Sequence, residues 1–308
     1  MALALSKRFG GLSMAAADSK SGELPEKGLL LIGMGMGSLE GMTLEAQAAA
    51  GAANHRRYEA YTALWPDDEL KRLEEKVGPI QRVMRPEVEE PDELFSLAKQ
   101  SLVALLVVGD PLQATTHVDL QLRAMDAGID CTVIHGISIT TVVTGAIGLS
   151  NYKFGRQTTL TYPYGNWIAT SPLEILAFNR EQNLHTLALL DLDPTGLGTG
   201  DQRPMRPKDA VESMRLMWEK LQNTREDIYA EKSERKASRQ MATEVYLQQS
   251  FDSVPVVLCS DMGTSNQSIV TTTLGNLAEE EGGRLNCLVF PASTGEIEEK
   301  AMLRWKKE

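Results

Sequence analysis

An unbroken aliphatic run, "LVALLVV" at residues 102–108, most strongly constrains how this chain can fold. A strand that is apolar at every position suits the middle of a parallel sheet, where helices cover both faces. The run is too short to cross a membrane. It ends in Gly109-Asp110-Pro111, and a second apolar run, "LLLI" at residues 29–32, ends in a glycine-rich turn. Both runs predict buried strands with tight turns at their carboxyl ends.

Strand-like and helix-like segments alternate along the first half of the chain. Strands are expected near residues 29–32, 57–61, 81–84, 102–108 and 131–136. Helices are expected near residues 43–53, 67–77, 91–101 and 116–127. This alternation predicts a parallel sheet with helices on both sides.

The second half has a different texture. "TTLTYPYGNW" predicts an antiparallel or edge strand followed by a turn, and "LHTLALLDLD" predicts a buried strand. "VPVVLCS" and "LNCLVFPA" predict two further strands with a helix between them, and residues 207–249 are charged and helix-rich. These patterns indicate a second α/β domain.

The length of 308 residues suits two domains. We predict an N-terminal α/β domain at residues 28–140 and a C-terminal α/β domain at 141–308, with a charged insertion near 194–249. Residues 1–27 are small and polar, which predicts a disordered tail.

The glycines of "LIGMGMGS" do not follow either common phosphate-binding pattern. Gly33, Gly35 and Gly37 read G-x-G-x-G, whereas a dinucleotide fold requires G-x-G-x-x-G. A Walker A loop requires Gly-Lys-Ser/Thr, and no lysine follows. From this stretch alone, a strand-to-helix turn is the better interpretation.

Composition excludes some classes of function. The net charge of −11 argues against broad nucleic-acid binding, which depends on clustered basic residues. Three scattered cysteines indicate reduced thiols in apolar strands and hence a cytoplasmic protein. Four histidines show no metal-ligand spacing, so no metal site is expected.

Candidate ligand-binding residues follow the strand ends, where open α/β sheets bind their ligands. Asp110 could accept hydrogen bonds from a ligand or stabilise its own turn. Ser138 could bind a ligand or cap the next helix. His117 is interpreted as structural rather than as a base. No Ser/His/Asp arrangement or G-x-S-x-G motif is recognisable, so no catalytic residue is predicted.

Several ordered segments together resemble one family of proteins. "LIGMGMG", "YEAYT", "GDPLQATTHVDLQLRAMDAGI", "VIHGISI", "YKFGRQTTLTYPYGNW" and "NLHTLALLDLD" are similar to diphthine synthases, which are methyltransferases of the tetrapyrrole methylase superfamily. The resemblance covers about residues 28–300. It implies two α/β domains of the tetrapyrrole methylase type with the cofactor cleft between them.

The resemblance also implies the residues that bind S-adenosyl-L-methionine, the cofactor whose product is S-adenosyl-L-homocysteine. From the first domain and its junction these are Met36, Asp110, Gln113, Ser138 and Ile139. From the second domain they are Leu190, Met262 and Asn286. Met36 replaces the family's usual leucine, and Asn286 stands where histidine is often found.

The activity implied by the resemblance is N-methylation of the 3-amino-3-carboxypropyl-histidine of translation elongation factor 2, in diphthamide biosynthesis. The resemblance implies a homodimer as well. The cysteines and the short apolar runs predict a cytoplasmic protein without membrane association. Two alternatives remain open. One is a related methyltransferase acting on a corrinoid or on RNA, although the net charge argues against RNA. The other is a noncatalytic module that binds the cofactor.

Overall fold

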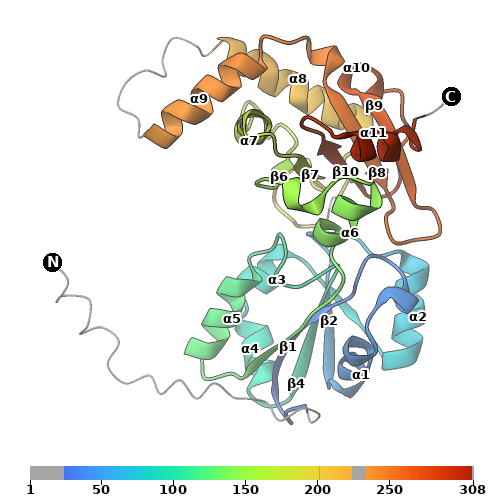
Figure 1. Cartoon of the computed structure of the whole chain (residues 1–308). Coiled ribbons are helices and arrows are strands. Elements are labelled where there is room, and N and C mark those ends of the chain that lie inside the picture. The colour runs from blue at the N-terminus through green and yellow to red at the C-terminus, as the bar shows by residue number, and fades with distance from the viewer. Residues whose placement is uncertain (1–23, 201, 224–233, 307–308) are drawn as a thin grey trace, which may run out of the picture.

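The computed structural model describes residues 24–200, 202–223 and 234–306, and it forms two lobes (Figure 1). Each lobe is built on one five-stranded sheet with helices on both faces. The predicted α/β class with two sheets is therefore confirmed. Most of the expected N-terminal tail, residues 1–23, lies outside the described residues.

The first sheet is entirely parallel, as predicted. Its strand order is β3 (Gln81–Val83), β2 (His55–Glu59), β4 (Leu102–Val107), β1 (Gly28–Gly33) and β5 (Cys131–Ile134). Every residue of β1 and β4 is buried. The continuous apolar runs thus occupy the central positions, where both faces are covered.

Helices cover both faces of this sheet because successive strand residues point to opposite sides. Leu30 and Ile32 pack with α1 (Leu44–Ala52) and α2 (Asp67–Val77). Leu29 and Leu31 pack on the other side with α4 (Asp92–Ala98) and α5 (His117–Asp126), next to the short α3 (Arg85–Glu89). The helices cover the two faces of the sheet and leave the carboxyl ends of its strands uncovered within this domain.

The second sheet is mixed. Its order is β6 (Thr158–Leu160), β7 (Thr186–Leu190), β10 (Asn286–Phe290), β8 (Pro255–Ser260) and β9 (Ser268–Thr273). The sequence predicted either an antiparallel or an edge strand at β6. The strand lies at the edge of the sheet, and it pairs parallel to β7. The remaining neighbours are antiparallel.

One expectation for the second sheet was incomplete. The stretch between β8 and β10 was predicted as a helix, whereas residues 268–273 form β9 and only the short α10 (Leu274–Leu277) is helical. The sequence "SIVTTT" is mostly β-branched, and such side chains lose rotamer freedom in a helix but pack well on a sheet. Pairing with β8 along the whole strand decides the outcome.

Helices also cover both faces of the second sheet. One face carries α7 (Ser171–Glu181), α8 (Pro207–Asn223), α9 (Glu234–Tyr246) and α10, which follows η3 (Phe251–Ser253). The other face carries α6 (Ile139–Ala146) and α11 (Glu296–Leu303). Met214, Met217 and Trp218 of α8 belong to the core, so this part of the charged stretch is structural. Residues 224–233 of that stretch lie outside the described residues.

Helix α6 lies at the junction of the lobes in Figure 1. It follows β5 of the first sheet, yet Val143 and the following Ile147 pack against Leu187 and Val257 of the second sheet. We place the domain boundary between β5 and α6, close to the predicted 140/141, as a proposal. Within the described ranges, no helix combines the length and the apolar character that a membrane span requires.

Candidate functional site

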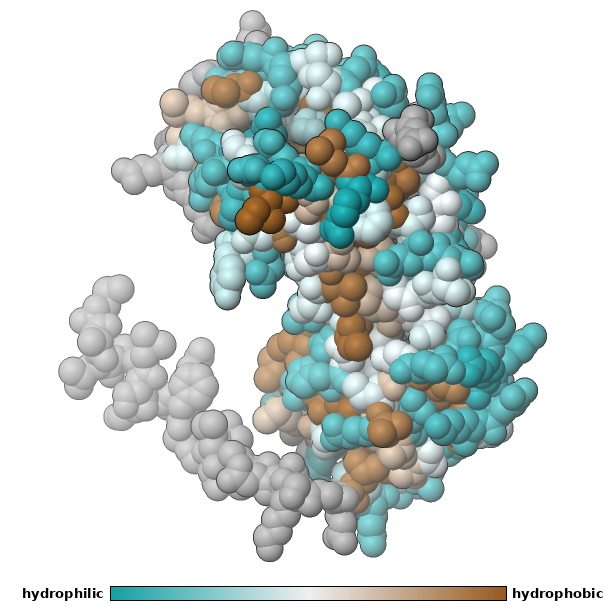
Figure 2. All heavy atoms as spheres, turned by 45° about the vertical axis from the view of Figure 1, so that its right-hand side comes forward, coloured by the Kyte–Doolittle hydropathy of each residue, from teal (hydrophilic) through white to brown (hydrophobic). Residues whose placement is uncertain are grey.

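A cavity lies between the two lobes, at the carboxyl ends of the first sheet's strands. Its open space, including the mouth, is about 970 Å³. Figure 2 shows the waist between the lobes, with hydrophobic side chains gathered at its centre. Seven of the eight predicted cofactor residues line the cavity: Met36, Gln113, Ser138, Ile139, Leu190, Met262 and Asn286. The fold therefore brings together residues that are up to 250 positions apart in the sequence.

The glycines at the strand ends allow β1, β4 and β5 to come into backbone contact. A Cβ on Gly33 would lie 2.4 Å from the amide nitrogen of Gly136, and a Cβ on Gly136 would lie 2.2 Å from the carbonyl oxygen of Gly109. Gly35 and Gly109 exchange two backbone hydrogen bonds of 3.2 and 2.8 Å. These glycines thus permit close backbone packing at the floor of the cavity, which no residue with a Cβ would allow.

Met36 reaches from this turn toward the second domain. A Cβ on Gly263 would lie 2.8 Å from the Cβ of Met36, so the missing side chain at 263 makes room for the methionine. Gly263 has a φ of +81°, a conformation that glycine adopts without strain. Met36 therefore lines the cavity in contact with the loop that follows β8.

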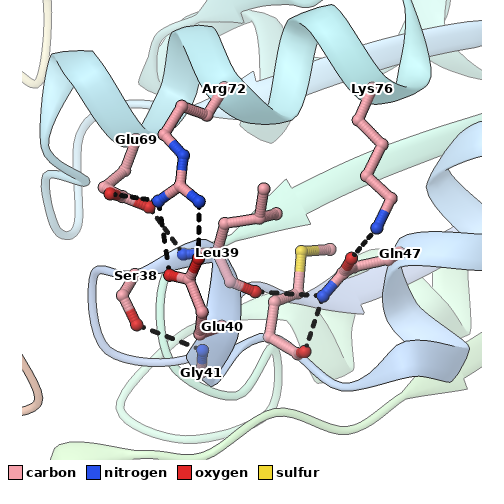
Figure 3. A network of polar contacts seen from close by, with 9 residues as sticks. Ser38, Leu39, Glu40, Gly41, Gln47, Glu69, Arg72 and Lys76 are labelled. Carbon is pink, nitrogen blue, oxygen red and sulfur yellow. Dashed lines mark hydrogen bonds and ion pairs between the residues drawn. The ribbon is translucent and has the colours of Figure 1, made fainter.

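A polar network anchors the segment after Met36 to α1 and α2 (Figure 3). Glu69 accepts a 2.7 Å bond from the amide of Leu39 in η1 (Leu39–Gly41). Arg72 pairs with Glu40 and Glu69 at 2.5 and 2.7 Å. Gln47 donates to the carbonyls of Leu39 and Met42 at 3.0 and 2.9 Å. This network fixes the path of the chain that carries Met36.

Asp110, the eighth predicted residue, is not among the cavity-lining residues. Its side chain is buried, and Oδ1 accepts a 2.9 Å bond from the amide of Leu112. Oδ2 accepts from His135 Nδ1 at 2.7 Å and from the amide of Gly136 at 3.3 Å. The carboxylate thus joins the turn after β4 to the turn after β5, and its contact with a cofactor stays a prediction.

Ser138 caps a helix while lining the cavity. Its Oγ accepts bonds from the amide and the hydroxyl of Thr140, at 3.3 and 3.0 Å, at the start of α6. Ser138 therefore caps α6, which was one of the two roles predicted for it from the sequence. The residue's side chain is buried, so a ligand would meet this position mainly through backbone groups.

Asn286 is held by its own loop. Oδ1 accepts from Ser260 Oγ at 2.8 Å and from the amide of Gly283 at 2.7 Å. Nδ2 donates to the carbonyls of Met205 and Gly283 at 3.3 and 3.1 Å. Since both ends of the amide are engaged, this position can offer its backbone to a ligand.

Sequence reasoning missed part of the cavity wall. Thr62 and Thr115 lie in the quoted motifs "YEAYT" and "GDPLQATTHVDLQLRAMDAGI", Ala63 directly follows the first motif, and all three line the cavity. Arg284 lines it too, and its guanidinium donates to the carbonyls of Leu64 and Trp65 at 2.7 and 3.0 Å. No local pattern marks an arginine that binds carbonyls of the other domain, so only the fold identifies it.

The cysteines occupy the positions expected of free thiols. Cys131 lies in β5, while Cys259 and Cys287 are cross-strand partners in β8 and β10. All three are free. The hydrogen bond with the neighbouring Cys287 and burial hold the pKa of Cys259 well above its usual value, so this cavity-lining residue carries an uncharged thiol.

Two α/β lobes with an amphiphilic cavity at their junction suggest a class of small-molecule-dependent enzymes, and comparison with known families identifies it. The family described as tetrapyrrole (corrin/porphyrin) methylases matches residues 28–278. The chain belongs to this family and is a methyltransferase.

Within the family, the chain is similar to diphthine synthases, which confirms the resemblance found in the sequence. It is 30% identical to diphthine synthase of Methanospirillum hungatei over 276 residues, covering 88% of this chain and 95% of that protein. A crystal structure of diphthine synthase superposes with a TM-score of 0.70 at 26% identity, covering 90% of this chain and 95% of the other. An Entamoeba histolytica protein assigned as a diphthine synthase superposes with a TM-score of 0.73 at 26% identity, covering 92% and 99%.

Proposed function

We propose that this methyltransferase uses S-adenosyl-L-methionine to N-methylate the 3-amino-3-carboxypropyl-histidine of translation elongation factor 2, in diphthamide biosynthesis. The observation that carries the proposal is the interdomain cavity, which gathers seven of the eight residues that the resemblance assigns to the cofactor. Similarity to diphthine synthases over nearly the whole chain supports the choice of substrate.

The lining of the cavity suits the proposed cofactor chemically. Met36, Ile139, Leu190 and Met262 provide an apolar surface. Among the described lining residues there is no lysine, and the guanidinium of Arg284 is engaged with carbonyls. A cationic sulfonium would therefore not meet a free basic side chain on this wall.

When bound, S-adenosyl-L-methionine supplies an electrophilic methyl group and leaves as S-adenosyl-L-homocysteine. The acceptor amine must be neutral, and it loses a proton after forming its new N–C bond. Such an in-line displacement depends chiefly on positioning, which can supply several kcal/mol. The glycine-packed strand ends and the loops at 110–116 and 261–264 would hold the reactants, and no catalytic base is assigned.

The direct test is methylation in vitro. We expect purified protein, the cofactor and elongation factor 2 carrying the 3-amino-3-carboxypropyl adduct to give methylated factor by mass spectrometry, and unmodified factor to give none. The spectrum also counts the methyl groups and shows whether the carboxylate is esterified. Methylation of a corrinoid or an RNA instead would establish the alternative substrate, and binding without any turnover would establish the noncatalytic module.

A matched pair of variants links the activity to the cavity. Ile139→Arg puts a long cationic side chain into the lining of the cavity, which would repel a cationic cofactor, and should weaken cofactor binding at least tenfold by calorimetry. Ile137→Arg is the control, because Ile137 is 47% exposed and does not line the cavity. Equal effects of the two substitutions would argue against this cavity as the cofactor site.

We also propose a homodimer, on the strength of the resemblance alone, and a cytoplasmic location, from the cysteine pattern. Light scattering at micromolar concentration should give twice the monomer mass of 33.8 kDa. A monomer mass would exclude the dimer and leave the proposed activity untouched.

A further inference from the structure

Two buried titratable side chains face one another behind the wall of the cavity. Glu59 ends β2 and His117 begins α5, and their side chains are 0% and 1% exposed. Glu59 Oε2 lies 3.6 Å from His117 Nε2. Within the described part of the chain, neither atom has a hydrogen-bond partner. Buried polar atoms are rarely left in this state, so the pair calls for an explanation.

The other ring nitrogen fixes the histidine tautomer. His117 Nδ1 lies 2.9 Å from the carbonyl oxygen of Pro111, and a carbonyl can only accept a hydrogen bond. Nδ1 therefore carries a proton, and in a neutral imidazole Nε2 is an acceptor. An ionised Glu59 would then place two acceptors face to face.

We propose that Glu59 and His117 share one proton and that this pair positions two walls of the cavity. The shared proton makes the contact between Oε2 and Nε2 attractive. The inference rests on the proposed function only in taking these walls to be the ones that hold the cofactor.

Each partner is bonded to a wall. Glu59 Oε1 accepts a 3.2 Å bond from the amide of Thr62, which lines the cavity together with Ala63. His117 is bonded to Pro111, whose carbonyl also accepts a 2.7 Å bond from the hydroxyl of the cavity-lining Thr115. One proton between Glu59 and His117 therefore connects the loop after β2 to the loop after β4.

A second buried pair in the same protein shows the opposite arrangement. His185 Nδ1 accepts a 2.9 Å bond from the amide of Ala292, so its Nε2 carries the proton and donates to Glu298 at 3.2 Å. Glu298 also accepts from the amides of Ser150 and Gly295 and from Lys153. Although partial burial opposes it, these donors lower the pKa of Glu298 to about 2. The donors around Glu298 stabilise an ionised carboxylate, whereas an ionised Glu59 would face the acceptor nitrogen of His117.

The surroundings of Glu59 favour the proton staying on the pair. Burial raises the pKa of Glu59 to about 7, against the lowering effects of Thr62 and of Arg85 on α3. Burial also lowers the pKa of His117. Tyr58 of β2 and Tyr61 in the loop after β2 also interact electrostatically with Glu59, and burial raises the pKa of both phenols. A neutral pair, with the proton on the carboxyl group, is thus preferred below about pH 7.

The test compares cofactor affinity across pH in three variants by calorimetry. The Glu59→Gln side chain can donate to Nε2 and accept from the Thr62 amide without titrating, so its affinity should stay within about twofold of wild type near pH 6. Wild-type affinity should fall above pH 7, where Glu59 ionises, while the Glu59→Gln affinity should not. Glu59→Ala should bind about tenfold more weakly throughout, since a bond is lost. Glu298→Gln is the matched control and should follow the wild-type pH profile.

A measurement without ligand separates this inference from the proposed function. Nitrogen-15 NMR of the full chain should show His117 Nδ1 protonated and Nε2 as a hydrogen-bond acceptor, and Glu59→Ala should remove that bond. An unprotonated His117 Nδ1 would contradict the proposed proton sharing. An affinity equal to that of the wild type in a folded Glu59→Ala variant would contradict the positioning role of the pair. If the wild type binds no cofactor, the proposed function fails while the NMR result still decides the pair.

Discussion

At the scale of single residues, polar groups in this protein mainly join loops that meet at the cavity. Asp110 connects the turns after β4 and β5, and Asn286 connects three segments of the second domain. The sequence marks Asp110 as a strand-end carboxylate but not its partners. The local sequence around a strand-end residue does not distinguish a residue that stabilises the loops of a site from a residue that contacts the ligand.

We predict that Asp110→Ala lowers both stability and cofactor affinity. It removes the acceptor for the Leu112 amide and for His135, and a hydrogen bond to a charged group is worth about 1.5–3 kcal/mol. The melting temperature without ligand and the dissociation constant should be measured together. Asp110→Asn is the control, because its amide oxygen can still accept from Leu112. A lowered melting temperature with unchanged affinity would restrict Asp110 to the turns.

We predict that stability falls with rising pH because of Glu59. Its pKa is raised from 4.5 to about 7 in the folded state, so the folded protein holds this proton more tightly than the unfolded chain does. The free energy of unfolding should therefore drop between pH 4.5 and pH 7, by up to about 3 kcal/mol. Urea unfolding of wild type and Glu59→Gln across this window isolates the contribution. Parallel curves would show that Glu59 does not titrate as described.

At the scale of elements, the contacts between strand ends determine the floor of the cavity. Strand β1 ends at Gly33, and Gly109 and Gly136 follow two residues after the ends of β4 and β5; the backbones of these glycines touch. An apolar pattern predicts each strand separately. It does not predict how closely the ends approach, since that depends on sheet twist and on the turns that follow.

We predict that Gly136→Ala destabilises the protein by about 1–3 kcal/mol, the usual cost of overpacking. Its Cβ would lie 2.2 Å from the Gly109 carbonyl oxygen, where only backbone could move away. Gly145→Ala is the control: a Cβ there meets nothing within 4 Å, and α6 should gain about 1 kcal/mol from alanine. Chemical denaturation measures both. A neutral Gly136→Ala would mean that the strand ends can separate freely.

At the scale of the whole molecule, the site exists only where the two domains meet. Arg284 of the second domain bonds the carbonyls of Leu64 and Trp65 in the first, and Gln202 bonds the carbonyl of Ala60. The residues that line the cavity come from both domains as well. Domain alignment and ligand affinity should therefore be coupled.

We predict that Arg284→Met weakens cofactor affinity about tenfold or more, because it removes two charge-assisted bonds between the domains. Arg123→Met is the control, since Arg123 bonds the Glu89 carbonyl within the first domain at 2.7 Å. Calorimetry should show a loss only for Arg284→Met. Comparable losses in both variants would point to general destabilisation.

The sequence alone determined the strands of the first sheet, their parallel direction and the end at which the ligand cavity lies. Those follow from continuous apolar runs and from the alternation of strands with helices, which are local properties of the chain. The resemblance added cofactor residues from both domains.

Only the tertiary structure decided what depends on distant segments meeting. The strand β9, the parallel pairing of β6, the interdomain bonds of Arg284 and the facing atoms of Glu59 and His117 belong to this group. Local propensity alone does not decide strand pairing, because the partner strand supplies the hydrogen bonds and the packing surface. A buried pair is invisible in the sequence because its two members, 58 positions apart, are brought together only by folding.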